Sequence, residues 1–301
     1  MIHAFFQQTR RNLKIFLKDK ANIFFSLLSP LIVLALYVLF LGRVQTDGIL
    51  AVLGDAVTDE VRSAVESFCD AWMLVGGIAC ACITVPLCAC GISVQDKKRG
   101  VTADLLASPV AKWVPSAAYF ASVLVSGLII SLAVLAVGFV WLAATGSWYL
   151  SVFDAFGCIG SLVLSVFSSS ALFSLIIGFI RSEGAFTGLN VISGTVVGFL
   201  IGAYMPVSMF PQGVQYFTLF IPGSYSAGLL RNFVMRGALD RISAIVSPEF
   251  AESLADQFSF SFDFFGLEIG IGGMAVALAV SVFAAVAVWG VVVFIRRRRK
   301  K

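Results

Sequence analysis

The sequence predicts an all-α integral membrane protein with six transmembrane helices, an N-terminal amphipathic interfacial helix and an outer re-entrant hairpin before the last span. Composition is the first observation behind this prediction. Of the 301 residues, 59% are apolar and 13% are charged, whereas the apolar share of soluble domains is about 45–50%. The second observation is a mean hydropathy of +0.97. Soluble enzymes, nucleic-acid-binding proteins and secreted disulfide-rich scaffolds are therefore excluded.

Six apolar runs are long enough to cross a bilayer, whose hydrocarbon core of about 30 Å needs about 20 helical residues. They are Asn22–Leu41, Ala71–Val94, Ser116–Ala144, Ala155–Ile180, Ala185–Met205 and Ile269–Ile295. Between the last two lies an extracellular or re-entrant segment, 206–268, whose shorter apolar run Val214–Leu230 is broken by Pro222 and Gly223. A broken run is typical of a re-entrant hairpin, because freed backbone groups at membrane depth need protein or water around them. We expect residues 1–301 to form a single transmembrane domain.

Charged residues divide unevenly between the two sides that six spans define. One side holds residues 1–21, 95–115, 181–184 and 296–301, with 16 Lys/Arg and four Asp/Glu. The other side has five Lys/Arg and 13 Asp/Glu. The positive-inside rule assigns the basic side to the cytoplasm. The sequence therefore predicts a multi-pass protein of the cytoplasmic (plasma) membrane with both termini in the cytoplasm.

The first 21 residues predict a cytoplasmic amphipathic helix. Its apolar residues recur at helical spacing, while glutamine, arginine and lysine fill the other face. The apolar set is Ile2, Phe5, Phe6, Leu13, Phe16 and Leu17. Two interpretations stay open: the helix is a basic anchor that lies on anionic lipid, or it also forms part of a docking surface for a cytoplasmic partner.

The cytoplasmic loop 95–115 predicts a charged turn followed by a short helix. Gly100 interrupts the helix that comes down from the second span, and Thr102 is a candidate cap for the next helix. That helix is expected to end before the Ser108-Pro109 step. The alternative is a solvated connector whose basic residues serve only the membrane topology.

Three regions of the chain resemble ABC-2 type exporter permeases. In the cytoplasmic loop of that family a charged residue, Arg-Gly, a threonine, a leucine pair and Ser/Thr-Pro-Val recur. The matching residues are Arg99-Gly100 and Thr102-Ala103-Asp104-Leu105-Leu106-Ala107-Ser108-Pro109-Val110 in the loop, Pro206-Val207-Ser208, Pro211, Val214-Gln215, Pro222 and Leu229-Leu230-Arg231 in the outer segment, and Phe24-Phe25-Ser26-Leu27-Leu28-Ser29-Pro30 near the start. Asp96 stands where a glutamate is common, which keeps the charge.

The resemblance implies a membrane subunit that pairs with a second permease subunit, identical or closely related, and with two copies of a cytoplasmic ABC ATPase. The residues it assigns to ATPase coupling are Asp96, Arg99, Gly100, Thr102, Asp104, Leu105, Leu106, Ser108 and Pro109. The chain contains no G-x-x-x-x-G-K-S/T phosphate-binding loop. ATP and Mg²⁺ are therefore expected on the partner ATPase, and no cofactor is expected on this chain, which would not itself be an enzyme.

The fifth predicted span carries Gly194, Gly198 and Gly202 at four-residue spacing, which lets another backbone approach one face of a helix. Packing within the chain and an interface between subunits both stay open. Polar residues on the second and fifth spans are candidates for lining a transport pathway. They are Thr84, Asn190, Ser193 and Thr195.

Four of the six cysteines form two Cys-x-Cys pairs on the second span, but neighbours two apart on a helix point about 200° away from each other. No metal site is expected. The predicted spans carry no ionisable residue at depth, which argues against an ion-coupled carrier. The function that we predict is ATP-driven export of a drug-like, peptide, lipid or lipid-linked substrate. A secondary carrier or channel, a membrane-embedded enzyme and a non-transporting scaffold for the ATPase stay open as alternatives.

Overall fold

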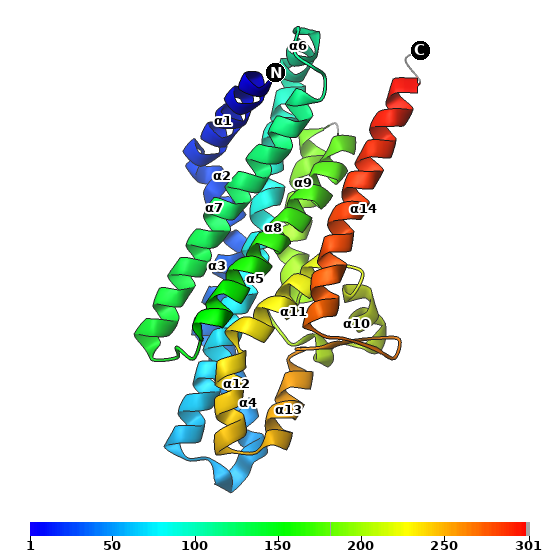
Figure 1. Ribbon diagram of the computed structural model, residues 1–301. Helices are drawn as coiled ribbons and strands as arrows, with labels where there is room; N and C mark the ends of the chain where they lie inside the picture. The colour runs from blue at the N-terminus through cyan, green and yellow to red at the C-terminus, as the bar shows by residue number, and fades with distance from the viewer. Residues whose placement is uncertain (181, 299–301) are drawn as a thin grey trace.

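The computed structural model describes residues 1–180 and 182–298, and the side chains of residues 55, 106 and 289–298 lie outside that description. The chain forms an elongated helical bundle (Figure 1). In the described part of the chain, five helical segments are long and apolar enough to cross a membrane: Leu28–Leu53, Asp59–Lys98, Val114–Thr145, Val152–Phe179 and Ile271–Val288. The all-α membrane class is confirmed.

Helix α5 (Asp59–Lys98) is the centre of the bundle. Its 40 residues correspond to a length of about 60 Å at a rise of 1.5 Å per residue, about twice the hydrocarbon thickness. Thr58 caps its start by accepting from the Val61 amide, and Lys97 and Lys98 lie in its last turn, where they complement the helix dipole. In the most apolar 18-residue stretch of α5, 94% of the residues are buried inside the molecule.

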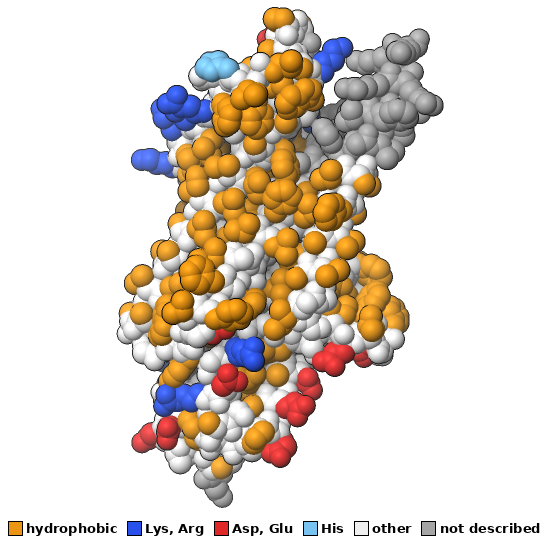
Figure 2. All heavy atoms as spheres, in the orientation of Figure 1, with side chains coloured by type: hydrophobic (Ala, Val, Ile, Leu, Met, Phe, Trp, Pro, Cys, Tyr) orange, Lys and Arg blue, Asp and Glu red, His pale blue; other side chains and the backbone are white. Residues whose placement is uncertain are grey.

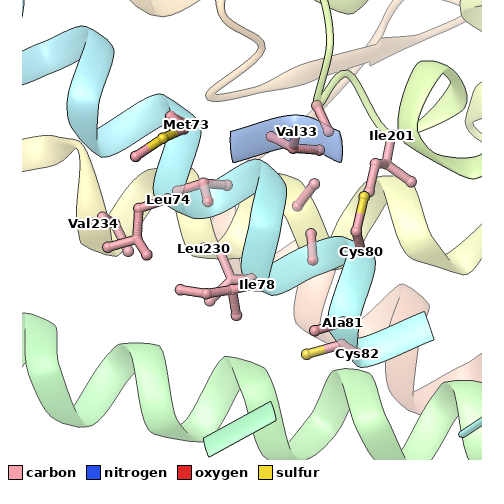
Figure 3. Close-up of a cluster of buried hydrophobic side chains, with 14 of the residues drawn as sticks. Val33, Met73, Leu74, Ile78, Cys80, Ala81, Cys82, Ile201, Leu230 and Val234 are labelled. Carbon is pink, nitrogen blue, oxygen red and sulfur yellow. The ribbon is translucent and has the colours of Figure 1, made fainter. Parts of the chain in front are cut away.

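The neighbours of α5 complete the core. They are α7 (Val114–Thr145), α8 (Val152–Phe179), α9 (Glu183–Leu200), α3 (Leu28–Leu36) and α11 (Pro222–Val234). Figure 3 shows side chains of α5, among them Ile78 and Cys80, meeting Val33 of α3, Ile201 beyond α9, and Leu230 of α11. Helix α5 therefore packs directly on each of these five helices and runs through the centre of the bundle.

The N-terminal part is a chain of short helices. Helix α1 (Ile2–Lys18) leads through α2 (Lys20–Ser26) and α3 into a π-helical turn (Tyr37–Leu41), α4 (Gly42–Leu53) and a 3₁₀ turn (Gly54–Ala56). Helix α1 lies along α7 with Gln8, Asn12 and Phe16 buried at a spacing of four residues. The first apolar segment runs on to Leu53, beyond the predicted end at Leu41, because the helix continues after its apolar stretch stops.

Helix α9 starts close to the predicted fifth span, but it ends earlier. The predicted run Ala185–Met205 is wrong in its last five residues, since Leu200 is the last helical residue. Gly202 has a φ of +72°, a left-handed conformation that ends a helix. Helix α9 is not among the five segments long and apolar enough to span, so the count of six spans stays a prediction.

The outer segment holds most of the irregular structure. A 3₁₀ turn (Val207–Met209) leads to α10 (Gln212–Thr218), and α11 starts with Pro222 in its first turn, where the missing amide is tolerated. Helix α11 packs against α5, α8 and α14 (Ile271–Arg298). Whether α10 and α11 enter the bilayer as a re-entrant hairpin is not shown, and the hairpin stays a prediction.

Beyond α11, helices α12 (Arg236–Ile245) and α13 (Pro248–Gln257) pack on each other, and α12 packs on α5. A small antiparallel hairpin then joins β1 (Phe262–Phe264) to β2 (Leu267–Ile269), with Phe262 opposite Ile269. These two strands depart from the all-helical expectation. They pair because each strand alternates apolar residues with one acidic residue, and the two strands flank a tight turn at Phe265-Gly266.

The charged side chains of the described residues are distributed unevenly between the two ends of the molecule. Figure 2 shows Lys and Arg at the end that carries α1 and α6 (Val101–Ala107), and most of the Asp and Glu, together with some Lys and Arg, at the end that carries α12 and α13, with a largely apolar surface between the two ends. The N-terminus and the C-terminal end of α14 lie at the basic end (Figure 1). This separation agrees with the charge asymmetry on which the predicted topology depends.

Candidate functional site

The short helix α6 follows α5 after a single turn. Gly100 has a φ of +81°, a conformation that favours glycine because it has no side chain. Helix α6 starts at Val101, so Thr102 lies inside its first turn and does not cap it, contrary to our expectation. The helix ends at Ala107, as predicted, because Ser108 is extended before Pro109. The Ser108 hydroxyl donates to the Leu105 carbonyl at 2.6 Å.

Asp96, in the last turn of α5, joins three helices. Arg11 of α1 donates to its carboxylate through both guanidinium ends, at 2.5 and 2.9 Å. The Tyr119 hydroxyl of α7 donates to the same carboxylate at 2.6 Å. Only 4% of the Asp96 side chain is exposed, against 39% for Arg11. We call Asp96, Arg11 and Tyr119 the basic-end node.

The electrostatics of this node favour a permanent ion pair. The hydrogen bond from Arg11 to Asp96 raises the pKa of the guanidinium above its usual value. A paired arginine and carboxylate in two-pronged geometry is both stronger and more directional than a single charged contact. The node therefore fixes α1 and α7 to the end of α5 from which α6 departs.

A cavity of about 290 Å³ separates α1 from α6. Its lining includes Gln7 and Arg11 from α1 and Val101 and Leu105 from α6. Leu105 is half-buried against this cavity, while Arg99, Asp104 and Pro109 are exposed. The side chain of Leu106 lies outside the described residues. Helices α1 and α6 thus line one cavity at the basic end of the molecule.

The other side of the same α5 terminus contacts α8 and α9. The Lys97 ammonium donates to the carbonyls of Ile177 and Ile180, at 3.0 and 3.4 Å, where α8 ends. Lys98 forms an ion pair with Glu183 in the first turn of α9. The last residues of α5 are therefore tied to α1, α7, α8 and α9 around the base of α6.

The four candidate pathway residues have different surroundings. The Thr84 hydroxyl is buried and donates to the Ser26 carbonyl at 2.7 Å, which ties α5 to α2. The Asn190 amide contacts the Cys88 thiol at 3.3 Å and ties α9 to α5. Ser193 is buried, whereas Thr195 is exposed and bonds the backbone of its own helix. Two of these four side chains therefore hold helices together, and their role in a pathway stays a prediction.

The three glycines of the fifth predicted span have different surroundings. A side chain at Gly194 would meet nothing within 4 Å, whereas a Cβ at Gly198 would lie 2.3 Å from the Tyr204 ring. Gly202 lies in the turn after the helix, next to Arg231. Gly198 and Gly202 thus accommodate side chains of the same chain, and Gly194 alone of the three faces open space.

Arg231 is a residue whose role the sequence did not indicate. It is 1% exposed, and its guanidinium donates to the backbone carbonyls of Ile201 at 2.6 Å, Gly202 at 3.3 Å and Ser259 at 3.4 Å. These bonds satisfy carbonyls beyond the end of α9, where a cation is also favoured by the helix dipole. No pattern connects residues so far apart in sequence, and Tyr119 was missed for the same reason.

Comparison with known proteins gave one family. The model of the family described as ABC-2 type transporter matches residues 3–235, which include α1, the basic-end node, α6 and α11. No curated protein and no solved structure matched the chain. Residues 3–235 are well over half of the 301-residue chain, and the chain therefore belongs to the ABC-2 type transporter family.

Proposed function

We propose that this chain is the permease of an ATP-driven exporter that moves a drug-like, peptide, lipid or lipid-linked substrate outward across the cytoplasmic membrane. Membership of the ABC-2 family makes it the membrane subunit of an ABC transporter, which is not itself catalytic and which associates with an ABC ATPase. The outward direction, the substrate class and the use of ATP and Mg²⁺ bound by the partner are our proposal.

The observation that carries the proposal is the basic-end node. Helix α6 departs from α5 through Gly100, four residues after Asp96. A force on α6 therefore reaches α5 at a point where Arg11 and Tyr119 hold the helix to α1 and α7. Because α5 continues as one helix to the acidic end, a displacement at its base is carried through the bilayer region. This arrangement supports a coupling role for Asp96, Arg99, Gly100 and the residues of α6.

The node also favours one interpretation of α1. Helix α1 shares a cavity with α6 and is held to the bundle through Arg11, so it is more than an anchor on lipid. We propose that α1 and α6 together receive the ATPase. The basic end then faces the cytoplasm, both termini lie there, and two ATPase copies and a second permease subunit complete the transporter.

A secondary carrier or channel is the second candidate, and the two are separated by purification. The affinity-tagged chain, extracted from its native membrane, should retain an ATPase that hydrolyses ATP with Mg²⁺. The native mass of the complex should correspond to two permease and two ATPase subunits. If the chain is purified without an ATPase under conditions that preserve its fold, and an ion gradient alone drives its transport, the proposal is wrong.

The coupling role is tested by Arg11→Gln in the purified complex. We expect the change to lower the rate at which the bound ATPase hydrolyses ATP, because the base of α5 is no longer held to α1. The matched control is Arg10→Gln, which removes the same charge from an exposed neighbouring residue. Equal rates for both variants and the unmodified complex would contradict the role of the node.

A further inference from the structure

An exposed cluster of aromatic residues lies between the apolar belt and the acidic end of the molecule. Its side chains come from α10, from the residues after α10, and from the β1–β2 hairpin. The exposed members are Phe217 (57%), Phe220 (70%), Phe265 (67%) and Leu267 (66%). With Tyr216 and Phe264 they form what we call the aromatic patch. A surface of this kind on a protein needs an apolar environment, because large exposed apolar groups in water are unfavourable.

The rings of the patch are ordered against one another. Phe265 stacks on Tyr216 with their ring centroids 4.3 Å apart. Phe264 meets Phe220 edge to face at 5.9 Å. Helix α10 and the hairpin therefore present one continuous surface.

The hairpin turn directs an aromatic side chain outward. Phe265 and Gly266 have φ values of +52° and +87°, as a two-residue turn of type I′ requires. Asparagine or aspartate is the usual first residue of such a turn, because a phenylalanine with positive φ is strained. The stack on Tyr216 is one contact that holds this strained conformation at the exposed tip.

The two faces of the hairpin have opposite character. In an antiparallel pair, directly opposed residues share a face, so Phe264 and Leu267 lie on one face and Asp263 and Glu268 on the other. Asp263 and Glu268 are both exposed. Two opposed carboxylates require water. The hairpin therefore lies at a boundary, with an apolar environment on the side of Phe265 and Leu267 and water on the side of Asp263 and Glu268.

The position of the hairpin identifies that environment. Gly270 alone separates β2 from α14, one of the five apolar segments long enough to span. Exposed apolar residues continue from the patch along α14, among them Val276, Val280 and Phe283. In Figure 2 the apolar surface reaches the level of α10 and the hairpin, and acidic side chains begin below it. The patch thus lies at the level where a membrane span begins.

We propose that the aromatic patch inserts into the outer leaflet, at the boundary between acyl chains and headgroups, and anchors the outer segment to the membrane surface. Aromatic residues are enriched at this boundary. The exposed members of the patch then meet lipid, while Phe262 of the same hairpin face stays packed on the protein and Asp263 and Glu268 face the aqueous side. The assignment to the outer leaflet rests on the proposed orientation, but not on the ATPase partner or the substrate, and the hairpin part of the patch lies beyond the residues matched by the family model.

Nitroxide labelling tests the proposal in the full-length protein. All six native cysteines are buried, so a label reacts at an introduced surface cysteine, and the unmodified protein measures the background. Phe265→Cys is labelled and reconstituted into vesicles of phosphatidylethanolamine and phosphatidylglycerol. Collision rates are measured with oxygen, which partitions into lipid, and with a nickel chelate, which stays in water.

Three labels set the scale. Ser253→Cys on α13 is the aqueous reference, Phe283→Cys on α14 is the lipid reference, and Glu268→Cys is the matched control on the other face of the hairpin. Ser253, Phe283 and Glu268 are all exposed. We expect the oxygen-to-nickel ratio at residue 265 to lie above the ratios at 253 and 268 and below the ratio at 283.

Two results would overturn the proposal. A ratio at residue 265 equal to that at 253 would mean that the patch faces water. Low collision with both reagents would mean that protein covers it, such as a second copy of the chain. Phe217→Cys on α10 provides an independent label on the same patch outside the strained turn, and it must give the same result.

Discussion

Helix α5 carries two carboxylates, one at the basic end and one towards the acidic end, that each join neighbouring elements, but their surroundings differ. At the basic end Asp96 is buried and has the charged partner Arg11 together with Tyr119. Towards the acidic end Asp70 is half-buried and accepts from the Tyr37 hydroxyl at 2.9 Å and the Ser147 hydroxyl at 3.0 Å. Tyr37 opens the π-helical turn, and Ser147 follows α7. We call Asp70, Tyr37 and Ser147 the acidic-end node.

The two nodes differ in which partners the carboxylate keeps when one of its hydrogen bonds is broken. A buried carboxylate that loses its arginine is left without a counter-charge, which is costly. A half-buried carboxylate that loses one hydroxyl keeps access to water and to its second partner. The basic-end node is therefore suited to transmit a displacement without yielding. The acidic-end node is suited to let the π-helical turn and the α7–α8 connection shift.

The largest expected effect follows from breaking the basic-end node from each side in turn. Arg11→Gln leaves the buried Asp96 without its charged partner and with the Tyr119 hydroxyl still bound, and we expect it to lower the free energy of unfolding by about 2–3 kcal/mol. Asp96→Asn leaves the partly exposed Arg11 accessible to water and should cost about 1 kcal/mol. Equilibrium unfolding of the purified protein in mixed micelles measures both values. An equal loss for both variants would contradict the claim that Asp96 depends on its counter-charge.

An intermediate effect is expected from two glycines that lie at opposite ends of the molecule. Gly100 and Gly146 have φ values of +81° and +76°, and an added Cβ meets nothing within 4 Å at either residue. Gly100→Ala and Gly146→Ala should therefore each cost about 1–2 kcal/mol through backbone strain alone. Only Gly100→Ala should also reduce hydrolysis by the associated ATPase, because it changes how α6 leaves α5. A similar reduction by Gly146→Ala would remove the distinction between the two ends.

Five of the six predicted apolar runs overlap helical segments that are long and apolar enough to cross a membrane, but the runs did not predict where the helices end. Helix α5 starts at Asp59, 12 residues before the predicted Ala71, because a capped polar extension has no apolar signature. Helix α9 stops early because Gly202 adopts a left-handed conformation, which a glycine permits but does not require. Hydrophobic periodicity predicts which face of a helix is buried, but it does not predict where a turn ends the helix.

The coupling residues could be predicted from the sequence more completely than the contacts that hold them in place. The turn at Gly100 and the end of α6 at Ser108-Pro109 follow from local backbone chemistry and were predicted. The pairing of Arg11 with Asp96 spans 85 residues of sequence, and Arg11 is one of several basic residues on α1. Which of these basic residues pairs with Asp96 depends on how α1 packs along α7. No local sequence pattern predicts that packing.

The smallest expected effect comes from the acidic-end node. Tyr37→Phe removes one hydroxyl from Asp70 and keeps the ring in place, so we expect a loss of about 1 kcal/mol in the free energy of unfolding. Ser147→Ala removes the other hydroxyl and should cost a similar or smaller amount, since Asp70 then keeps Tyr37 and water. Combined, the two changes should cost more than their sum, because the carboxylate loses both partners. The same micelle unfolding assay gives all three values, and hydrogen exchange of the Tyr37–Leu41 amides reports whether the π-helical turn opens. Faster exchange in Tyr37→Phe with unchanged ATPase association would support an acidic-end node that lets the π-helical turn open.

A loss of unfolding free energy in Tyr37→Phe as large as that in Arg11→Gln would mean that both nodes hold α5 equally firmly. The contrast between the two nodes would then be wrong.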